Sequence, residues 1–349
     1  MKIVVISDPK LISQIESKNP KKTNELENKN NSQEKIKNPL AILQDALNDF
    51  DNKVSFFPPK LDEIIHLKPK SYDLIINNAD KISTNYHPAQ IVGIFDLTQI
   101  PYCGSQIDAI TICKNKPLFK SLLKLNHIAT PKFQILKIQG GKIPEIRKDF
   151  KYPLVLKFFN AGIHTHSIKD KVIKNSVELQ ENLKIFLNKT KNYFALLEEY
   201  ITGRKFYLPI LGNELNNNIR FLPAIETLSS EEDLQANLLA DSNLLEKKFL
   251  ELTDPLVKHA RKIAKKAYNF FNCRDYAMAV FILDKNTNNL LLHEINPITS
   301  LLPNGKISIA AEHLGILYSE IINDIILATL LRYGFKLKGK YVKKHKNIK

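Results

Sequence analysis

Apolar and polar positions in the first hundred residues follow a pattern that predicts short buried strands separated by helices. Residues 2–7, 54–57 and 72–77 are almost continuously apolar, which is typical of strands covered on both faces of a parallel sheet. Residues 40–50 instead have the three-to-four-residue apolar spacing of a helix that covers such a sheet. This alternation predicts an open, parallel α/β sheet at the N-terminus.

The rest of the chain predicts mixed helices and strands, which favours one or two α+β domains after the parallel sheet. Asp254 is the expected N-cap of a helix that has Pro255 in its first turn. The expected helices are 116–126, 176–188, 255–271, 307–314 and 317–331, and the expected strands are 153–159, 193–201, 205–212, 220–225, 276–283 and 290–295.

Two segments have little to bury. Residues 16–38 are rich in Lys, Asn, Glu, Ser and Gln, which predicts a disordered or loosely helical insertion. Residues 332–349 hold Arg332 and seven lysines without an acid, so this end supplies +8 of the net charge of +15. We expect either a solvated, frayed end or a nonspecific anchor for anionic partners.

The net charge of +15 raises the question of nucleic-acid binding. Only 6 of the 51 basic residues are arginine, the residue that makes bidentate phosphate and base contacts. Nucleic acid is therefore not the expected partner. The absence of an apolar run of about 18 residues predicts no transmembrane helix, and the start of the chain predicts a first strand rather than a signal peptide.

Three cysteines, Cys103, Cys113 and Cys273, lack metal-like spacing and cannot all pair with one another. They indicate structural thiols in a reducing compartment, and a cytoplasmic location is the expectation.

Three features suggest chemistry, although each has an alternative when taken alone. Lys157 follows PLVL on a strand that is otherwise apolar, where it fits either a snorkelling edge lysine or a phosphate contact. Glu198 and Glu199 fit a solvated strand end as well as a site. Glu294 and Asn296 are two residues apart at a strand end, so both oxygens face one side and can hold a hard cation such as Mg²⁺.

In order along the chain, these features resemble the ATP-grasp superfamily, specifically the D-alanine–D-alanine ligase-like group. The most similar stretches are YPLVLKF, ALLEEYITGRKFYLPILGN, NCRDYAMAVFILD and HEINPITSLLPNGKISIAAEHLGILYSEII. The last two resemble the family patterns "CRDYARVDF" and "EVNPNP…P…AA…G". The resemblance implies a three-part architecture, in which an N-terminal open parallel sheet precedes two α+β subdomains that enclose a nucleotide cleft.

The resemblance implies domains at residues 1–115, 116–197 and 198–333, followed by a basic tail at 334–349. It also implies an ATP-dependent carboxylate–amine ligase that forms an acyl phosphate, with amino acids or peptides as substrates. Family members are often dimers, but the sequence has no independent dimer signal. Such an enzyme positions its reactants and neutralises charge.

Site residues follow from the resemblance by position. Lys116 and Lys157 would contact the nucleotide phosphates, and Gly162 and His164 would lie in the phosphate lid. The adenine hinge would use mainly backbone groups of Glu198, Glu199, Tyr200 and Ile201. Glu294 and Asn296 would hold Mg²⁺.

Several positions depart from the family pattern. Met278 replaces an Arg on the substrate side, Val280 replaces a metal-binding Asp, and Lys205 replaces the acid that binds ribose hydroxyls. Losing a carboxylate should weaken at least one metal site. The lid at residues 160–166 retains one glycine, and the N-terminal substrate loop at 78–90 lacks the family's acidic, Gly-rich pattern.

These departures leave three hypotheses open. The first is a working ligase. The second is a catalytically impaired ATP-grasp protein that acts by binding nucleotide or a partner. The third is a basic binder of nucleic acid or anionic surfaces, whose binding would depend steeply on salt.

Overall fold

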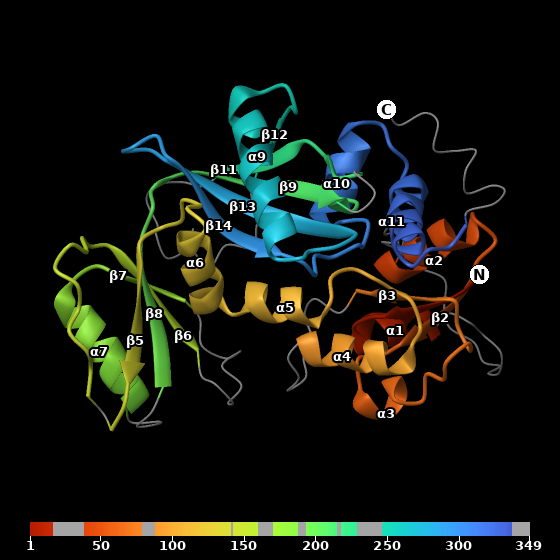
Figure 1. The fold of residues 1–349 in the computed structure, drawn as a ribbon, viewed down its shortest axis with the longest axis horizontal. Coiled ribbons are helices and arrows are strands. Elements are labelled where there is room, and N and C mark those ends of the chain that lie inside the picture. The colour runs from red at the N-terminus through yellow and green to blue at the C-terminus, as the bar shows by residue number, and fades with distance from the viewer. Residues whose placement is uncertain are drawn as a thin grey trace, which may run out of the picture.

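The computed structural model describes residues 1–16, 38–78, 88–140, 142–159, 170–187, 193–214, 218–228 and 246–336. Several predicted features lie outside these ranges. They are most of the insertion at 16–38, most of the loop at 78–90, the lid with Gly162 and His164, and most of the tail at 334–349. The described residues form three sheets (Figure 1).

The first sheet is parallel and has the strand order β2-β1-β3-β4. Successive residues of its central strand pack on opposite sides, Ile3 and Val5 in one core and Val4 and Ile6 in another. The strands are β1 (Lys2–Ile6), β2 (Lys53–Phe57), β3 (Leu74–Asn77) and β4 (Tyr102–Cys103). The apolar runs thus formed the predicted buried strands, because helices cover both faces.

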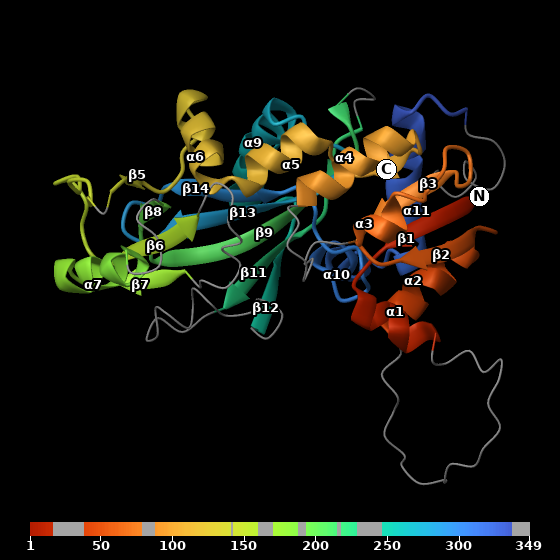
Figure 2. The same cartoon turned by 90° about the horizontal axis from the view of Figure 1, so that it is seen from below.

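Helices α1 (Pro9–Glu16) and α2 (Pro39–Asn48) lie on one side of the first sheet, and α3 (Leu61–Ile64) and α4 (Pro88–Thr98) lie on the other. The sequence analysis predicted only α2 among these four. Figure 2 shows α4, α5 (Ile107–Lys114) and α6 (Lys116–Leu125) following one another along one side of the molecule, toward the other two sheets.

The second sheet is antiparallel, with the order β5-β8-β6-β7. One face packs on α7 (Ser176–Leu187) through a core that includes Leu156, Leu179 and Leu197. The strands are β5 (Phe133–Ile138), β6 (Leu154–Phe159), β7 (Lys171–Ile173) and β8 (Tyr193–Glu199). Strand β6 lies between β8 and β7, and the Lys157 side chain is only 5% exposed, so the edge-lysine interpretation is wrong.

The third sheet has the order β12-β11-β9-β13-β14, with β10 paired to β9. Its strands are β9 (Gly203–Leu211), β10 (Arg220–Phe221), β11 (Ala224–Leu228), β12 (Glu246–Leu250), β13 (Tyr276–Asp284) and β14 (Leu290–Asn296). The sequence predicted one strand over 220–225, but β10 and β11 are separate. Pro223 stands between them and lacks the N–H that a continuous ladder needs.

Helix α9 (Pro255–Phe270) covers one face of the third sheet, where its Ala260 and Ala264 pack with Ala277 and Ala279 of β13. It begins as predicted, because the Leu256 N–H donates to Asp254 Oδ1 over 2.8 Å. The other face carries Met278, which packs with α10 (Lys306–His313) and α11 (Tyr318–Arg332).

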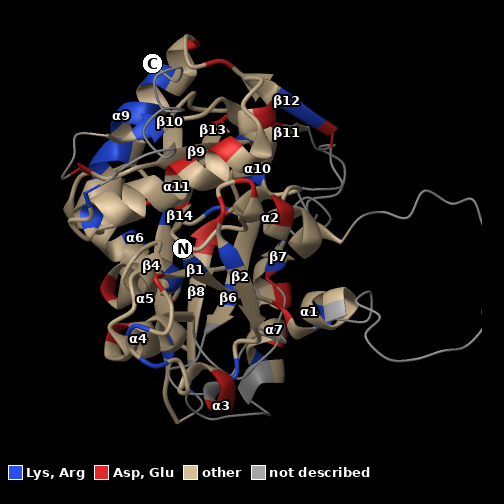
Figure 3. Cartoon of the chain, turned by 90° about the vertical axis from the view of Figure 1, so that its right-hand side faces the viewer, with Lys and Arg blue, Asp and Glu red and all other residues tan. Residues whose placement is uncertain are grey.

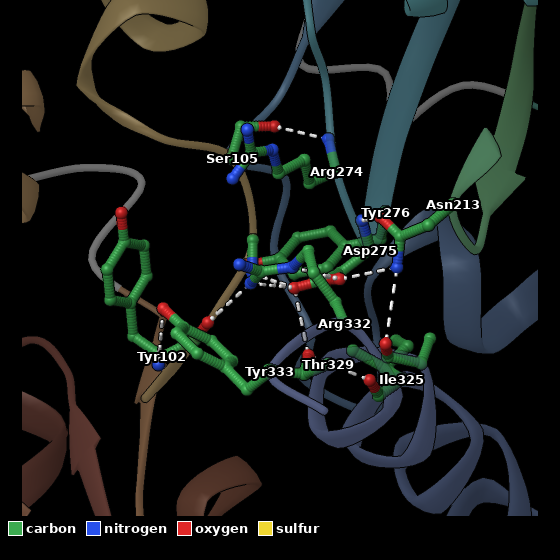
Figure 4. Close-up of polar contacts among 12 residues, drawn as sticks. Tyr102, Ser105, Asn213, Arg274, Asp275, Tyr276, Ile325, Thr329, Arg332 and Tyr333 are labelled. Carbon is green, nitrogen blue, oxygen red and sulfur yellow. Dashed lines mark hydrogen bonds and ion pairs between the residues drawn. The ribbon is translucent and has the colours of Figure 1, made fainter. Parts of the chain in front are cut away.

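A buried carboxylate, Asp275, connects the first sheet, the third sheet and α11 (Figure 4). It accepts hydrogen bonds from the Gly104 N–H after β4 at 2.8 Å, from Asn213 Nδ2 at 2.8 Å and from Thr329 Oγ1 at 2.9 Å. Arg332 completes the set, with Nη2 2.7 Å from Oδ2. Five donor atoms from three segments therefore surround one side chain.

Arg332 corrects the prediction that the C-terminal charges belong to a solvated end. Its side chain is only 5% exposed, and it also donates to the Tyr102 carbonyl over 2.9 Å. Part of the excess positive charge lies elsewhere, on α9, whose lysines and arginine are visible in Figure 3.

Within the described ranges, no single helix is long and apolar enough to cross a membrane; α10 and α11 pass that test only together, and they are bent by 117° at their break.

Asp275→Ala should destabilise the protein strongly. It leaves the Arg332 guanidinium buried without its carboxylate, and breaking a buried pair in this way costs about 3–5 kcal/mol. Urea unfolding followed by circular dichroism measures the change. Asp149→Ala is the matched control, because the Arg147–Asp149 pair is exposed to solvent and should contribute little to stability. Equal shifts in the two variants would contradict the central role of Asp275.

Candidate functional site

A cluster of buried and half-buried lysines lies where α5, α6, β6, β8 and β14 approach one another. We define the lysine cluster as Lys114, Lys116, Lys120 and Lys157, together with the acids Asp170, Glu198 and Glu294. Two of its members, Lys120 and Glu198, are nearly inaccessible, at 1% and 2% exposure.

Glu198 holds two of the lysines. Its Oε2 lies 2.5 Å from Lys157 Nζ, and its Oε1 lies 2.8 Å from Lys120 Nζ. In the β6–β8 ladder, Val155 is opposite Glu198 and Lys157 is opposite Leu196, so Lys157 and Glu198 are diagonal neighbours on one face. The opposite face carries the apolar core with α7. Glu198 is therefore no solvated strand end, and that interpretation is wrong.

The electrostatics favour a charged Glu198. Burial favours its neutral form, but the ammonium groups of Lys120 and then Lys157 outweigh burial and hold the pKa of Glu198 well below its usual value. Burial lowers the pKa of Lys120, and Glu198 opposes this shift only in part. Two cations thus share one carboxylate in a low-dielectric setting.

Lys116 and Lys157 converge on a second carboxylate. The Nζ atoms of both lysines lie 3.8 Å from Asp170 Oδ2. Burial opposes the charged form of Lys116, but Glu294, Asp170 and Glu198 raise its pKa above the usual value. The two residues predicted to contact phosphates therefore lie side by side and cationic, and the Lys116 side chain is 41% exposed.

Glu294 and Asn296 lie on β14 and face two departures from the family pattern. In the β13–β14 register, Val280 is directly opposite Glu294 and Met278 is directly opposite Asn296. Both are buried apolar side chains, at 6% and 3% exposure. Burial favours neutral Glu294, but Lys116 and Lys114 lower its pKa below the usual value.

A bulge changes which β14 residues face the cluster. The register shifts between Val280 and Phe281, so that His293 has no direct partner on β13. Burial, together with Lys157 and Lys120, holds the pKa of His293 well below its usual value, and the imidazole is neutral at pH 7. The pKa values of the adjacent residues His293 and Glu294 are therefore both lowered by lysines of the cluster. In a strand without a bulge, adjacent side chains would point to opposite faces of the sheet.

The predicted hinge lies at the end of β8. The N–H of Glu199 donates to the Lys132 carbonyl over 3.0 Å, and the N–H of Tyr200 donates to the Pro153 carbonyl over 3.2 Å. Ile201 follows. Gly203 then begins β9 in a tight space, because a Cβ there would lie 2.0 Å from the Leu283 carbonyl oxygen. The turn after the hinge therefore requires glycine.

Lys205 lies on β9, close to an aromatic ring. Its Nζ is 5.6 Å from the centre of the Tyr207 ring, and Lys306 Nζ, at the start of α10, is 4.4 Å from the same ring. Where the family pattern has an acid that binds the ribose, this protein thus has Lys205, with the ammonium group of Lys306 near the same ring.

The residues present do not fit a pair of Mg²⁺ ions. Val280 supplies no ligand opposite Glu294, and the Asn296 oxygen already accepts a hydrogen bond from Lys114 Nζ at 2.8 Å. No group of three His, Cys, Asp or Glu that could hold a metal occurs in the described part of the chain. Each Mg²⁺ is usually held by one or two carboxylates together with waters and substrate phosphates, and two such ions would share Glu294 as the single acid of β14.

Sequence reasoning missed Lys114, Lys120, Asp170 and His293. A signal existed for Lys120, because it follows Lys116 by four residues and so lies on the same side of α6. Lys114 and Asp170 had no local signal, since their partners are distant in sequence.

This geometry belongs to an ATP-grasp fold, and comparison with known proteins specifies the family. The model of the D-ala D-ala ligase C-terminus matches residues 122–327, so the chain belongs to that family of ATP-dependent ligases. The predicted resemblance and fold class are confirmed.

Individual relatives are distant. The chain is 27% identical over 271 residues to the uncharacterized protein y4sG of Sinorhizobium fredii, covering 74% of this chain and 75% of that protein. It is 26% identical to the D-alanine–D-alanine ligase of Pediococcus pentosaceus, covering 68% of this chain and 64% of that ligase. The crystal structure of the Bacillus anthracis D-alanine–D-alanine ligase complexed with ATP superposes with a TM-score of 0.66 at 18% identity, covering 97% and 100% of the two chains.

The pairing of Glu198 should make stability sensitive to acid. A carboxyl whose pKa is lowered by folding contributes its full stabilisation above its unfolded pKa of 4.5 and loses it as the pH falls toward the folded value. Glu198→Gln should cost about 3–5 kcal/mol at pH 7, because two ammonium groups lose their partner. The difference from wild type should stay constant between pH 7 and pH 5 and shrink below pH 4.5.

Urea unfolding at several pH values measures this difference. Glu181→Gln, which removes an exposed carboxylate on α7, is the control and should show no such pH trend. A gap between Glu198→Gln and wild type that persists unchanged at pH 3 would refute the assignment of the lowered pKa.

Proposed function

We propose that this protein is an ATP-dependent ligase that joins a carboxylate to an amine through an acyl phosphate, with amino acids or peptides as its substrate class. The observation that carries the proposal is the convergence of Lys116 and Lys157 on Asp170 at 3.8 Å. Two adjacent ammonium groups, one of them 41% exposed, form an arrangement that suits the phosphates of a nucleotide.

In this proposal the protein's residues position the reactants and neutralise charge. A substrate carboxylate oxygen attacks the γ-phosphorus of ATP, the bond to the β–γ bridging oxygen breaks, and ADP leaves. The amine then attacks the acyl carbon, phosphate leaves, and the nitrogen loses a proton. Lys116 and Lys157 stabilise the negative charge on the transferred phosphoryl group, and Glu198 holds Lys157 in place.

The nucleotide base is assigned to the hinge formed by Glu198 to Ile201. The N–H groups of Glu199 and Tyr200 are engaged within the protein, so we assign base recognition to the carbonyl of Glu199 and the N–H of Ile201. Gly162 and His164 remain the proposed lid residues, and Glu294 the proposed acid near the phosphates.

Met278 argues against transferring D-alanine specificity to this protein. The family pattern has an Arg at this position, and a thioether cannot stabilise a developing negative charge. Met278 is 3% exposed and packs in the core with α10 and α11. The substrate pair is therefore expected to differ from two D-alanines.

A second candidate function is nucleotide binding without ligation. Val280 opposite Glu294 and Met278 opposite Asn296 favour it, because both functional positions of the family strand have become apolar. Release of ADP in the presence of candidate amino acids and peptides separates the two. A ligase converts ATP to ADP continuously when a carboxylate and an amine substrate are both present, whereas a binding protein produces no ADP.

Lys157→Ala should lower nucleotide affinity about tenfold or more and reduce any turnover at least about 100-fold, because removing one preorganised charge from a reacting centre costs that much. Glu198 keeps its pairing with Lys120, so the fold should persist. Calorimetry with ATP and a coupled ADP assay measure the two effects. Lys137→Ala, an exposed lysine on β5 of the same sheet, is the control and should behave like wild type. Unchanged ATP binding in a folded Lys157→Ala variant would refute the proposed phosphate contact.

A further inference from the structure

Lys114 occupies an unusual place between two elements. It is the last residue of α5, which contacts β14, and its Nζ donates to Asn296 Oδ1 over 2.8 Å. Asn296 is the position that the resemblance assigns to a metal ligand. Asn296, which the resemblance would place on Mg²⁺, therefore binds the ammonium group of Lys114 instead.

The Asn296 oxygen has no further capacity. A side-chain carbonyl oxygen has two lone pairs. Lys114 uses one of them, and the backbone N–H of Ile298 donates to the same atom over 3.2 Å. Two donors to one atom also fix the orientation of the amide. A Mg²⁺ ligand bond is about 2.0–2.1 Å long, so a dication on this oxygen would collide with the ammonium group and repel it.

The surroundings reinforce this arrangement. Val280 and Met278 present apolar side chains to Glu294 and Asn296, where a metal site would need further oxygen ligands. Meanwhile Lys116, Lys114, Lys157 and Lys205 all act electrostatically on Glu294. Anionic ligands have been lost from this region, and side-chain cations surround the remaining acid.

We infer that Lys114 supplies at Asn296 the positive charge that a bound metal ion would supply, so that the protein binds the triphosphate of a nucleotide with little dependence on Mg²⁺. This inference rests on the proposed function and deepens it by naming the form of the co-substrate, a metal-free nucleotide polyanion. Lys114 is assigned as a phosphate-binding residue and not only as a structural contact.

The test is calorimetric titration of the full-length protein with ATP, in excess EDTA and in excess MgCl₂. Wild type should bind ATP under both conditions with affinities within about tenfold of each other. Lys114→Met removes the charge at similar length, and it should weaken ATP binding in EDTA by about 10- to 100-fold, the range for a charge-assisted hydrogen bond. It should also restore a clear gain of affinity on adding Mg²⁺, because the Asn296 oxygen becomes available.

The matched control is Lys262→Met, which removes an exposed lysine of α9 that does not belong to the lysine cluster. It should reproduce wild type under both conditions. Thermal melts establish that each variant is folded. A second readout is Mn²⁺ binding by electron paramagnetic resonance, with ATP present. The Lys114→Met variant should bind Mn²⁺ more tightly than wild type.

Three calorimetric results would contradict the inference about Lys114, and they differ in what they say about the proposed function. Wild-type binding that strengthens far more than tenfold with MgCl₂ would overturn the inference about Lys114 while leaving the proposed ligase intact. A Lys114→Met variant that binds ATP in EDTA as wild type does would overturn it too. Absence of ATP binding by wild type in both conditions would overturn the proposed function, and the inference with it.

Discussion

The buried pair between Asp275 and Arg332 is the interaction on which the arrangement of the parts depends. Asp275 stands just before β13, Arg332 ends α11, and both reach back to residues at the end of β4. Apolar packing alone would fix these segments less specifically, because it has no preferred direction. Five hydrogen bonds to one carboxylate are directional and therefore set the positions of the segments that donate them. The orientation of β13, and with it the position of β14 and Glu294, follows from this network.

The two buried charge networks of the protein differ in their balance. Around Asp275, five donor atoms are directed at the carboxylate and a single arginine neutralises it. Around Glu198, cations exceed anions, because Lys114, Lys116, Lys120, Lys157 and Lys205 act on the three acids Asp170, Glu198 and Glu294. A satisfied network rigidifies a fold, and one with excess charge is suited to a ligand of opposite sign.

The sequence predicted the elements whose signal is local and missed those whose cause is distant. The apolar runs of β1 and β3 and the Asp254 cap of α9 are short-range patterns, and the structure has them. Lys116 and Lys157 were chosen from position alone, yet they share Asp170, 13 residues beyond Lys157. Arg332 was counted with the tail because the charge pattern along the chain does not indicate its partner, Asp275, which is 57 residues away. The β14 bulge was equally invisible, since it is defined by a register with β13.

The proposed phosphate site is made of lysines, which would have a consequence for selectivity. An ammonium group is a compact point charge on a flexible stem, whereas a guanidinium is a flat fork that matches the geometry of one oxyanion. The lysine cluster contains no arginine, so its affinity for an anionic ligand would depend on the amount of negative charge more than on the geometry of the oxyanion. Discrimination between adenine nucleotides and other polyphosphates would then fall to the proposed hinge after β8, where Gly203 at the start of β9 fixes the path of the chain. Affinity and specificity would thus meet at Glu198, which pairs with Lys120 and Lys157 and also begins the proposed hinge, so a change at this one residue would alter both.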